Sequence, residues 1–432
     1  MNNNEILIIG SGGREHAIGW AIRKSPEAGR LLFAPGNAGT ALLENAENIP
    51  IAAENVDELV RFTLQRRPAL VVVGPEVPLA LGLADRLRGE GLPVFGPGAA
   101  GARLEASKSW AKSFMQRHNI PTAALQTFDT FDTAATYLQS QPGPYVVKAD
   151  GLAAGKGVLV TSNREEANRF ALEALGGDLF GKAGNRILVE EFMEGVEISA
   201  LAFCDTVSKT IIPLEPACDY KRAYDGDQGL NTGGMGAYSP PAFMTPALRK
   251  EVYESILLPT LQGLVSEGID YRGIVYAGLM LTAQGPKVIE YNCRFGDPET
   301  QSLLPRLDSD LLELLTATAN GKLASVGPVR WKEGASVGVV LVSAGYPGPY
   351  RKAMAVSGLE KLAELPDVFL FHAGTSFDNT GQVVTSGGRV FNMVAVGPNI
   401  ALARQRVYNI LGQKLVDFEE MRYRSDIAAR EV

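Results

Sequence analysis

The sequence has few of the residues on which covalent and metal-thiolate chemistry depends. Its three cysteines, Cys204, Cys218 and Cys293, show no Cys-x-x-Cys spacing and are odd in number, which argues against a structural zinc site and a disulfide framework. Its three histidines form no recognisable triad and no Gly-x-Ser-x-Gly occurs, so no covalent nucleophile is indicated. These absences favour a reducing compartment, and we expect the protein in the cytoplasm.

Long runs of apolar residues and clusters of basic residues are also missing. No stretch approaches the roughly 18 consecutive apolar residues of a membrane span, and the N-terminus reaches the strand-like Ile6–Ile9 without the regions of a secretory signal. With a net charge of −7 and no basic cluster, the chain lacks the footprint of a nucleic-acid-binding protein. We therefore expect small-molecule partners, with anionic substrates bound by local loops and lysines, and neither a membrane nor a nucleic acid.

What is present is an ordinary globular composition. The chain has 432 residues, 46% of them hydrophobic, which is enough for two to four domains. In the first hundred residues, short apolar runs are followed by glycine-bearing loops and helical patterns, as where Leu70–Val73 precedes Gly74. This alternation is typical of a parallel α/β sheet. Ligands of such sheets bind beyond the carboxyl ends of the strands, where the loops gather.

The loop Gly10–Gly13 follows one of these strands and opens a helix at Arg14. Backbone N–H groups at a helix N-terminus are the elements of an anion site. The third spaced glycine of a dinucleotide fingerprint is missing, so NAD is not indicated. Taken alone, the loop fits a phosphate site and a tight structural turn equally well.

A second glycine-rich loop, Lys148–Gly157, lies between two strand patterns. It is not a P-loop, because only three residues separate Gly151 from Gly155 and a glycine stands where Ser or Thr would bind magnesium. Such a loop can still fold over phosphates through its amides, with lysine neutralising charge. Taken alone, however, the loop is better interpreted as a flexible hairpin with a solvated lysine. Shortly before it, a helix carries Lys108 and Lys112 one turn apart.

Glu290, Asn292 and Arg294 are spaced by two residues in a strand pattern, so all three side chains point to one face. Two hard oxygen ligands and a guanidinium on one face suit magnesium with bridging phosphates and a transferring phosphoryl group. A solvated strand edge is the alternative, but asparagine is depleted in strands. The pattern therefore favours a metal and phosphate site.

An acidic segment, Glu190–Met193, follows another strand, and Glu197 lies seven residues beyond Glu190. Taken alone, such a segment is more typical of an acidic strand end; the alternative is a nucleotide-binding hinge with a carboxylate for the ribose. After about residue 328, short strands separated by turns indicate a small α+β domain. We predict three domains, the second with a mobile lid at about 123–193: residues 1–103, 104–327 and 328–432.

In this order, the pieces resemble the ATP-grasp superfamily, and over essentially its whole length the chain is similar to the glycinamide ribonucleotide synthetase family. The resemblance implies an α/β multidomain fold: a Rossmann-like N-terminal domain, an ATP-grasp core with a mobile lid, and a C-terminal α+β domain. It rests on ordered runs, of which Asn231–Pro240 and Arg294–Thr300 are together highly specific. The others are Ile9–His16, Pro35–Thr40, Gly74–Glu76, Lys148–Gly157, Gly345–Gly348 and Thr385–Arg389.

The resemblance implies ATP and Mg²⁺ or Mn²⁺ as cofactors. Glu290 and Asn292 would bind the metal, and Arg294 would face the transferred phosphoryl group, with Lys148 and Asp297 as the other catalytic residues. ATP would be bound by residues at its phosphates, adenine and ribose, namely Lys108, Lys148, Gly151, Gly155, Lys156, Gly157, Glu190, Glu191, Phe192, Met193 and Glu197.

The resemblance also implies where the other substrates bind. The N-terminal loop would hold the 5-phosphate of phosphoribosylamine, and Asp297 and Asn231–Gly236 would line the space for glycine and the amine. The full set is Gly10, Ser11, Gly12, Gly13, Arg14, Gly36, Asn37, Gly39, Thr40, Glu76, Asn231, Thr232, Gly233, Gly234, Met235, Gly236 and Asp297. Tyr220, Leu230 and Cys293 depart from the usual family residues, which leaves the role of the loop 219–222 open.

The implied reaction is the ATP-dependent joining of glycine to 5-phosphoribosylamine through a glycyl phosphate, an early step of purine synthesis. Because a carboxylate is a poor electrophile, phosphorylation first supplies a leaving group, and catalysis rests on alignment and charge neutralisation. A related carboxylase or formate-using ligase and a non-catalytic nucleotide sensor are the alternatives. We expect a monomer, with a weak dimer as the alternative.

Overall fold

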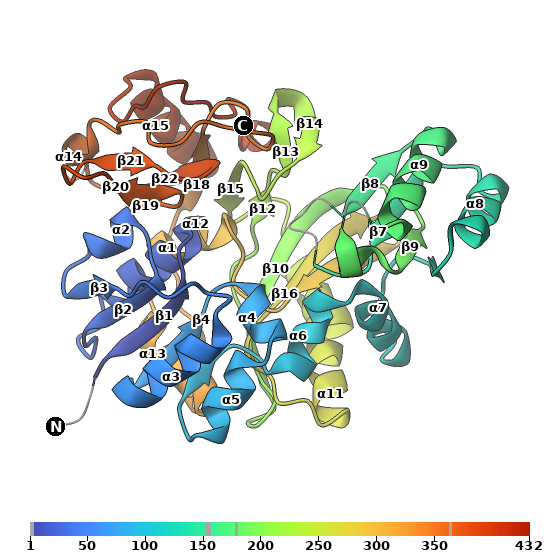
Figure 1. The fold of residues 1–432 in the computed structure, drawn as a ribbon, viewed down its shortest axis with the longest axis horizontal. Helices are drawn as coiled ribbons and strands as arrows, with labels where there is room; N and C mark the ends of the chain where they lie inside the picture. The colour runs from blue at the N-terminus through green and yellow to red at the C-terminus, as the bar shows by residue number, and fades with distance from the viewer. Residues whose placement is uncertain (1–3, 153–156, 178–179, 363–364) are drawn as a thin grey trace.

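The computed structural model describes residues 4–152, 157–177, 180–362 and 365–432. Figure 1 shows an N-terminal sheet and a C-terminal sheet on one side of a central sheet, and a fourth sheet with two helices projecting on the other side. None of the helices in the described part of the chain combines the length and the apolar character that a membrane-spanning helix needs.

The N-terminal sheet is parallel, with strand order β3-β2-β1-β4-β5, as the alternating pattern predicts. The central strands β1 and β4 are buried along their whole length, because helices cover both faces of such a sheet. Its elements are β1 (Ile6–Gly10), α1 (Gly13–Ile22), β2 (Leu31–Pro35), α2 (Ala38–Ala41), β3 (Ala46–Asn48), α3 (Val56–Arg66), β4 (Leu70–Val73), α4 (Glu76–Ala80), α5 (Leu83–Gly89), β5 (Val94–Phe95) and α6 (Ala99–Ala106).

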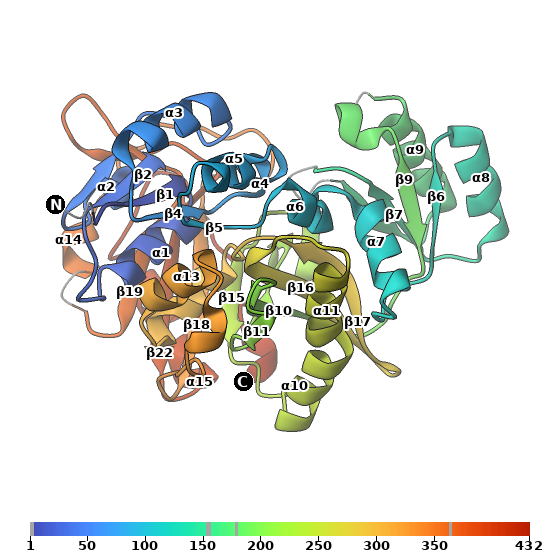
Figure 2. The same ribbon diagram turned by 90° about the horizontal axis from the view of Figure 1, so that it is seen from below.

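After helix α7 (Lys108–Arg117) comes an antiparallel sheet of order β6-β9-β7-β8. We call residues 125–190 the lid. Its helices α8 and α9 lie beside this sheet and pack around a hydrophobic cluster of its own, and Figure 2 shows the unit set apart from the other sheets. Its elements are β6 (Leu125–Phe128), α8 (Phe131–Ser140), β7 (Tyr145–Ala149), β8 (Val158–Thr161), α9 (Arg164–Leu175) and β9 (Ile187–Glu190).

The central sheet has the order β11-β10-β16-β17. The long strands β10 and β16 pair antiparallel along ten residues, and β17 turns back beside β16 and ends at Asn292. Helices α10 and α11 lie on one side of this sheet (Figure 2). The elements are β10 (Val196–Asp205), β11 (Thr210–Pro213), α10 (Pro246–Val252), α11 (Leu258–Ser266), β16 (Arg272–Thr282), β17 (Gly285–Asn292), α12 (Glu299–Leu303) and α13 (Leu311–Ala319).

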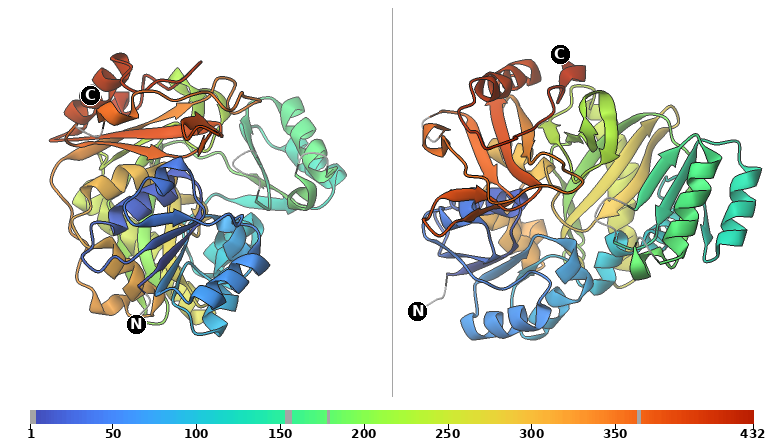
Figure 3. Two further views of the ribbon diagram at one scale, coloured as in Figure 1. Left: turned by 60° about the vertical axis from the view of Figure 1, so that its left-hand side comes forward. Right: turned by 45° about the horizontal axis from the view of Figure 1, so that its top comes forward.

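The C-terminal sheet, of order β12-β15-β18-β22-β19, does not begin at residue 328. Two of its strands, β12 and β15, come from before residue 328. Strand β15 pairs with β18 and β12 pairs with β15, so together they extend the sheet beyond β18. Figure 3 shows this sheet above the N-terminal sheet. The elements are β12 (Cys218–Asp219), β13 (Arg222–Tyr224), β14 (Gln228–Asn231), β15 (Gly236–Ser239), β18 (Ala335–Val342), α14 (Leu359–Leu362), β19 (Val368–His372), β20 (Thr375–Phe377), β21 (Val383–Thr385), β22 (Arg389–Gly397) and α15 (Ile400–Gly412).

Candidate active site

A buried carboxylate lies between two lysines where the lid meets helix α7. Oε2 of Glu190 is 2.9 Å from Nζ of Lys148 and 3.1 Å from Nζ of Lys112. Burial alone would raise the pKa of Glu190, but the two ammonium groups outweigh it and hold the pKa below its usual value. The sequence gives a signal for Lys112 only in its one-turn spacing from Lys108. Oε1 of Glu190 is buried without a hydrogen-bond partner in the described residues, so the cluster retains an acceptor for a ligand.

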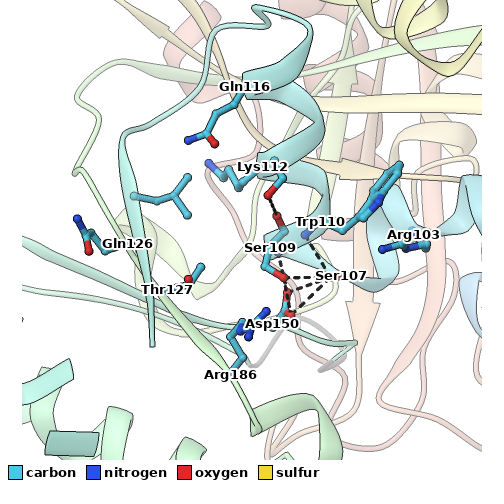
Figure 4. A pocket seen from close by; sticks show the side chains of 12 residues that line it. Arg103, Ser107, Ser109, Trp110, Lys112, Gln116, Gln126, Thr127, Asp150 and Arg186 are labelled. Carbon is cyan, nitrogen blue, oxygen red and sulfur yellow. Dashed lines mark hydrogen bonds between the residues drawn. The ribbon is translucent and has the colours of Figure 1, made fainter. Parts of the chain in front are cut away.

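The start of α7 is fastened to the stem of the glycine-rich loop. The Nζ of Lys108 donates to the carbonyl oxygens of Ala149 (2.8 Å) and Gly151 (3.1 Å). The Asp150 carboxylate accepts hydrogen bonds from the Ser109 backbone N–H (2.7 Å) and hydroxyl (2.8 Å), as Figure 4 shows. The Lys108 N–H also donates to the Asp150 carbonyl oxygen at 3.0 Å, so two N–H groups of the helix N-terminus bind residue 150, and the phosphate-binding candidate on α7 is the lysine side chain itself.

An open cavity of about 600 Å³ adjoins this junction. It lies between the start of α7 and strand β6 of the lid, and Figure 4 shows Lys112, Asp150 and Arg186 among the side chains around it. None of the predicted site residues lines it. Lys112, which pairs with Glu190, does line it, so the cavity borders the predicted site.

Glu290 and Asn292 lie near the end of β17, where they follow the alternation expected from their spacing. Nζ of Lys221 forms an ion pair with Glu197 and lies 3.6 Å from Oε1 of Glu290. Burial alone would raise the pKa of Glu290, but Lys221, Lys148 and Lys108 hold it below the usual value. The predicted ribose and metal ligands thus share one lysine, which the sequence pattern did not single out.

The described residues contain no group of three His, Cys, Asp or Glu side chains arranged to hold a metal ion. Glu290 and Asn292 offer two hard oxygens on adjacent same-face positions of one strand. This donor set fits a cation such as Mg²⁺, which usually takes one or two protein ligands and completes its shell with water and phosphate oxygens.

Arg294 follows the strand and is enclosed by acceptors. Its Nη2 donates to Glu105 and to Asn292, both at 2.9 Å, and its Nε lies 3.4 Å from Oε2 of Glu76. Burial would lower the pKa of the guanidinium, but Glu105 and Glu76 outweigh it and raise the pKa. Three segments distant in sequence therefore converge on this cation.

Asp297 joins the central region to the C-terminal sheet. Its Oδ2 lies 3.1 Å from Nη2 of Arg389, and Nη1 of the same arginine donates to the carbonyl oxygens of Gly233 and Asp297. Burial would raise the pKa of Asp297, but Arg389 and Arg14 keep it below the usual value. Arg389 lies in a run that matches the family, but its contact with Asp297 was not predicted.

The predicted phosphate loop lies directly beside Asp297. A Cβ added at Gly12 would be 3.3 Å from Oδ2 of Asp297 and 2.9 Å from Oε2 of Glu15. The Gly12 N–H already donates to that Glu15 oxygen at 2.6 Å. The Gly10–Gly13 loop thus lies at the site, and the Glu15 carboxylate already binds an N–H group of this loop at the start of α1.

Other predicted substrate residues have structural partners. Thr40 is fully buried, and its hydroxyl donates to Asn48, so it does not reach the open part of the site. The buried Asn37 amide donates to the carbonyl oxygens of Ser11 and His372. Met235 is fully buried as well. These three side chains hold the neighbouring loops in place.

The hinge residues and the glycine-rich loop are placed only in part. Glu191 accepts a hydrogen bond from the Ala124 N–H and Phe192 is 43% exposed, so both side chains lie apart from the Glu190 carboxylate. Gly157 is the end of the loop at β8, where its carbonyl accepts from Ala149. The remaining predicted loop positions, Gly155 and Lys156, lie outside the described residues.

Comparison with known proteins covers nearly the whole chain. It is 46% identical over 428 residues to the phosphoribosylamine–glycine ligase of Vibrio vulnificus strain CMCP6, which spans 99% of this chain and 98% of that protein. It is 48% identical over 424 residues to the protein of the same name from Synechocystis sp., which spans 98% of this chain and 99% of that protein.

Solved structures agree. The phosphoribosylamine–glycine ligase of Thermotoga maritima superimposes with a TM-score of 0.85 at 34% identity, over 98% of this chain and all of that one. A biotin carboxylase domain from Hydrogenobacter thermophilus superimposes with a TM-score of 0.74 at 16% identity, over 97% of this chain and 91% of that one, a likeness of fold alone. The predicted multidomain fold is therefore confirmed.

Family models match three consecutive parts of the chain. They are the phosphoribosylglycinamide synthetase N domain at residues 4–105, the ATP-grasp (A) domain at 106–300 and the C domain at 336–430. The chain therefore belongs to the phosphoribosylglycinamide synthetase family, and its middle part is an ATP-grasp domain.

Proposed function

We propose that this chain is the ATP-dependent ligase that joins glycine to 5-phosphoribosylamine, forming glycinamide ribonucleotide, ADP and phosphate in purine biosynthesis. The observation that carries the proposal is a series of charged groups, each interacting with the next, from Glu190 and Lys148 through Glu290 and Arg294 to Asp297. It provides a nucleotide end and a substrate end in one site. The relatives that match nearly the full chain are named for this reaction.

The residues present have roles that follow from their charges. Lys108 and Lys148 would neutralise the ATP phosphates, and Glu190–Met193 and Glu197 would take the adenine and ribose. Glu290 and Asn292 would hold Mg²⁺ or Mn²⁺, which would neutralise phosphate charge. The glycine-rich loop from Gly151 to Gly157 would cover the phosphates and exclude water from the reaction.

Arg294 would stabilise charge on the phosphoryl group as it passes to the glycine carboxylate. The amine of phosphoribosylamine would then attack the carbonyl carbon of the glycyl phosphate and phosphate would leave. Asp297, whose pKa is lowered, stays ionised at neutral pH and is suited to hold an ammonium or amine close to that carbon. The 5-phosphate would lie at the Gly10–Gly13 loop, on N–H groups other than that of Gly12, because Glu15 already binds the latter.

The protein would act in the cytoplasm as a monomer. Its three cysteines are free and buried in the structure, as suits a reducing compartment. Both statements are proposals, and sedimentation of the purified chain would test the second.

The test is phosphate release from ATP in the presence of glycine and freshly generated phosphoribosylamine, with each omitted in turn and the product mass measured. Release that needs both substrates, with a product of glycinamide ribonucleotide mass, is expected. Release without glycine would instead indicate a related carboxylase or formate-using ligase. Absence of release from folded, ATP-binding protein would indicate a nucleotide sensor.

A further inference from the structure

Helix α6 ends with a carboxylate that is directed entirely at the end of strand β17. The Glu105 side chain is only 8% exposed. Its Oε2 accepts hydrogen bonds from the backbone N–H of Cys293 (2.8 Å) and from the Cys293 thiol (3.2 Å), and its Oε1 accepts from Nη2 of Arg294 (2.9 Å). One buried side chain therefore binds two consecutive residues that lie far from it in sequence.

These contacts fix the Arg294 guanidinium in one orientation. Nη2 is used fully, by Glu105 and by Asn292, and Nη1 donates to the carbonyl oxygen of Phe295 at 3.2 Å. The buried Nε has no hydrogen-bond partner in the described residues, although Glu76 lies 3.4 Å away. The guanidinium is thus held on two sides by Glu105 and Glu76, and the Phe295 carbonyl takes one of the two N–H groups of Nη1, so the other can donate to an anion.

Glu105 also stands next to the nucleotide-binding segment. Two residues later Ser107 caps α7, and Lys108 is the first residue of that helix. A displacement of Arg294 from Glu105 would therefore change the distance between Arg294 and Lys108, two cations that are proposed to act on the same chain of phosphates. Alignment of such groups governs rate more strongly than affinity, because charge that develops in the transition state needs donors already in place.

We propose that Glu105 is a positioning residue, which holds the Arg294 guanidinium and the end of β17 in register with Lys108. The proposal rests on the proposed ligase function, in which Arg294 faces the transferred phosphoryl group. The thiol of Cys293 adds a further hydrogen bond to the same carboxylate.

The test compares Glu105→Gln with the wild type and with Glu215→Gln. Glu215 forms a 2.9 Å pair with Arg249 away from the site, so its variant makes the same chemical change and is expected to keep the wild-type rate. Glu105→Gln is expected to lower kcat about 10- to 100-fold with a nearly unchanged KM for ATP, as a misplaced catalytic group does. In an Arg294→Ala background, Glu105→Gln is expected to add little, because the two changes remove one interaction.

Crystal structures of the wild type and of Glu105→Gln give a readout that does not depend on turnover. The variant is expected to show Arg294 displaced or in several conformers, with α6 and α7 unchanged. An unmoved Arg294 with a wild-type kcat overturns the proposal, and so does a full additional loss of rate in the Arg294→Ala background. If the wild type itself makes no product, the ligase function fails while the crystal structures still decide the positioning role.

Discussion

The lid packs around one hydrophobic cluster of its own, whereas the N-terminal, central and C-terminal sheets share two. All buried members of the lid cluster lie between Phe128 and Val189. In contrast, one of the shared clusters contains Leu7, Ile198 and Val339, which belong to three different sheets. Because apolar burial is the main stabilising contribution in folding, the three sheets form one body, and the lid is a separate unit attached to it.

The lid is attached to the body by hydrogen bonds and ion pairs rather than by a shared hydrophobic cluster. Lys148 donates to the Ile289 carbonyl at 3.2 Å, Lys112 pairs with Glu190, and Asp150 binds the N-terminus of α7. Polar contacts exchange with water or ligand at a small net free energy, so the lid can change position while the body stays intact. Since Lys148 and Glu190 are among the residues proposed to bind ATP, nucleotide binding and lid position should be coupled.

The largest expected effect follows from replacing Lys148, which both joins the lid to the body and is proposed to bind the ATP phosphates. Lys148→Met should lower kcat at least 10²- to 10³-fold, the range seen when one preorganised donor at a reacting centre is lost. Among the described residues, it also leaves the Glu190 carboxylate with Lys112 as its remaining ion-pair partner. Steady-state kinetics would check this, with Lys250→Met as the control, since Lys250 forms an exposed pair with Glu254. A nearly normal kcat would remove Lys148 from the site.

A cavity in the core of the lid should destabilise the lid alone, whereas a cavity in the core of the body should destabilise more than one sheet. Leu138→Ala in the lid should destabilise by about 2–5 kcal/mol and Phe203→Ala in the body by about 3–5 kcal/mol, since both side chains are fully buried. Hydrogen exchange followed by mass spectrometry would locate the effects. We expect faster exchange within residues 125–190 alone for the first variant.

For Phe203→Ala, exchange should rise in both the N-terminal and the central sheets. The reason is that the Phe203 ring contacts Phe95 and Phe295 at centroid distances of 5.8 and 5.9 Å. Faster exchange throughout the chain after Leu138→Ala would mean that lid and body are one cooperative unit.

Acid should loosen the body before the lid. His16 and His372 are buried between the N-terminal and C-terminal sheets, and the backbone N–H of His372 donates to Nδ1 of the His16 ring at 2.8 Å. Burial lowers the pKa of His372 to about 4 and, with the nearby His372, that of His16 to about 3. The unfolded chain therefore binds these protons first, and the stabilisation is complete above an unfolded pKa of about 6.5 and is lost as pH falls.

Urea unfolding at neutral pH and near pH 4 would check this in the wild type and in His372→Gln. At about 1.4 kcal/mol per pKa unit, one histidine accounts for a few kcal/mol of the difference. The variant should therefore show a smaller loss of stability in acid. An equal loss in both would exclude His372 as the cause.

The local parts of this site could be predicted from the sequence. Alternation along a strand is a property of the backbone, so Glu290 and Asn292 are found together near the end of β17 as expected, and the parallel N-terminal sheet follows from its apolar runs. The family resemblance added the order of the motifs. For Glu290 and Asn292, and for the strands of the N-terminal sheet, the residue pattern within each element was sufficient.

The contacts between elements could not be predicted, because spacing carries no information about them. Glu105 and Arg294 are 189 residues apart, and His16 and His372 are 356 apart. The two-residue strand β12 is too short to show a pattern, so its place in the C-terminal sheet was missed. Partners of this kind are set by the order of strands in the sheets.

The smallest effect should come from the junction at Asp150, where the lid stem meets α7. Asp150→Asn keeps an acceptor for the Ser109 N–H and loses the negative charge at the helix N-terminus, which is worth about 0.3–1 kcal/mol. We therefore expect a KM for ATP that rises by no more than about fivefold, with kcat and thermal stability close to wild type. ATP-dependence of the rate would measure this.

Asp150→Ala provides the graded comparison, since it removes both acceptor oxygens and should have a larger effect, up to about 2 kcal/mol, as the loss of a helix cap does. If Asp150→Asn abolished turnover instead, the carboxylate would have to act on a substrate, and its hydrogen bonds to Ser109 would be incidental. A small, graded effect would mean that the lid is held to the body by several weak polar contacts, each of which the nucleotide can replace.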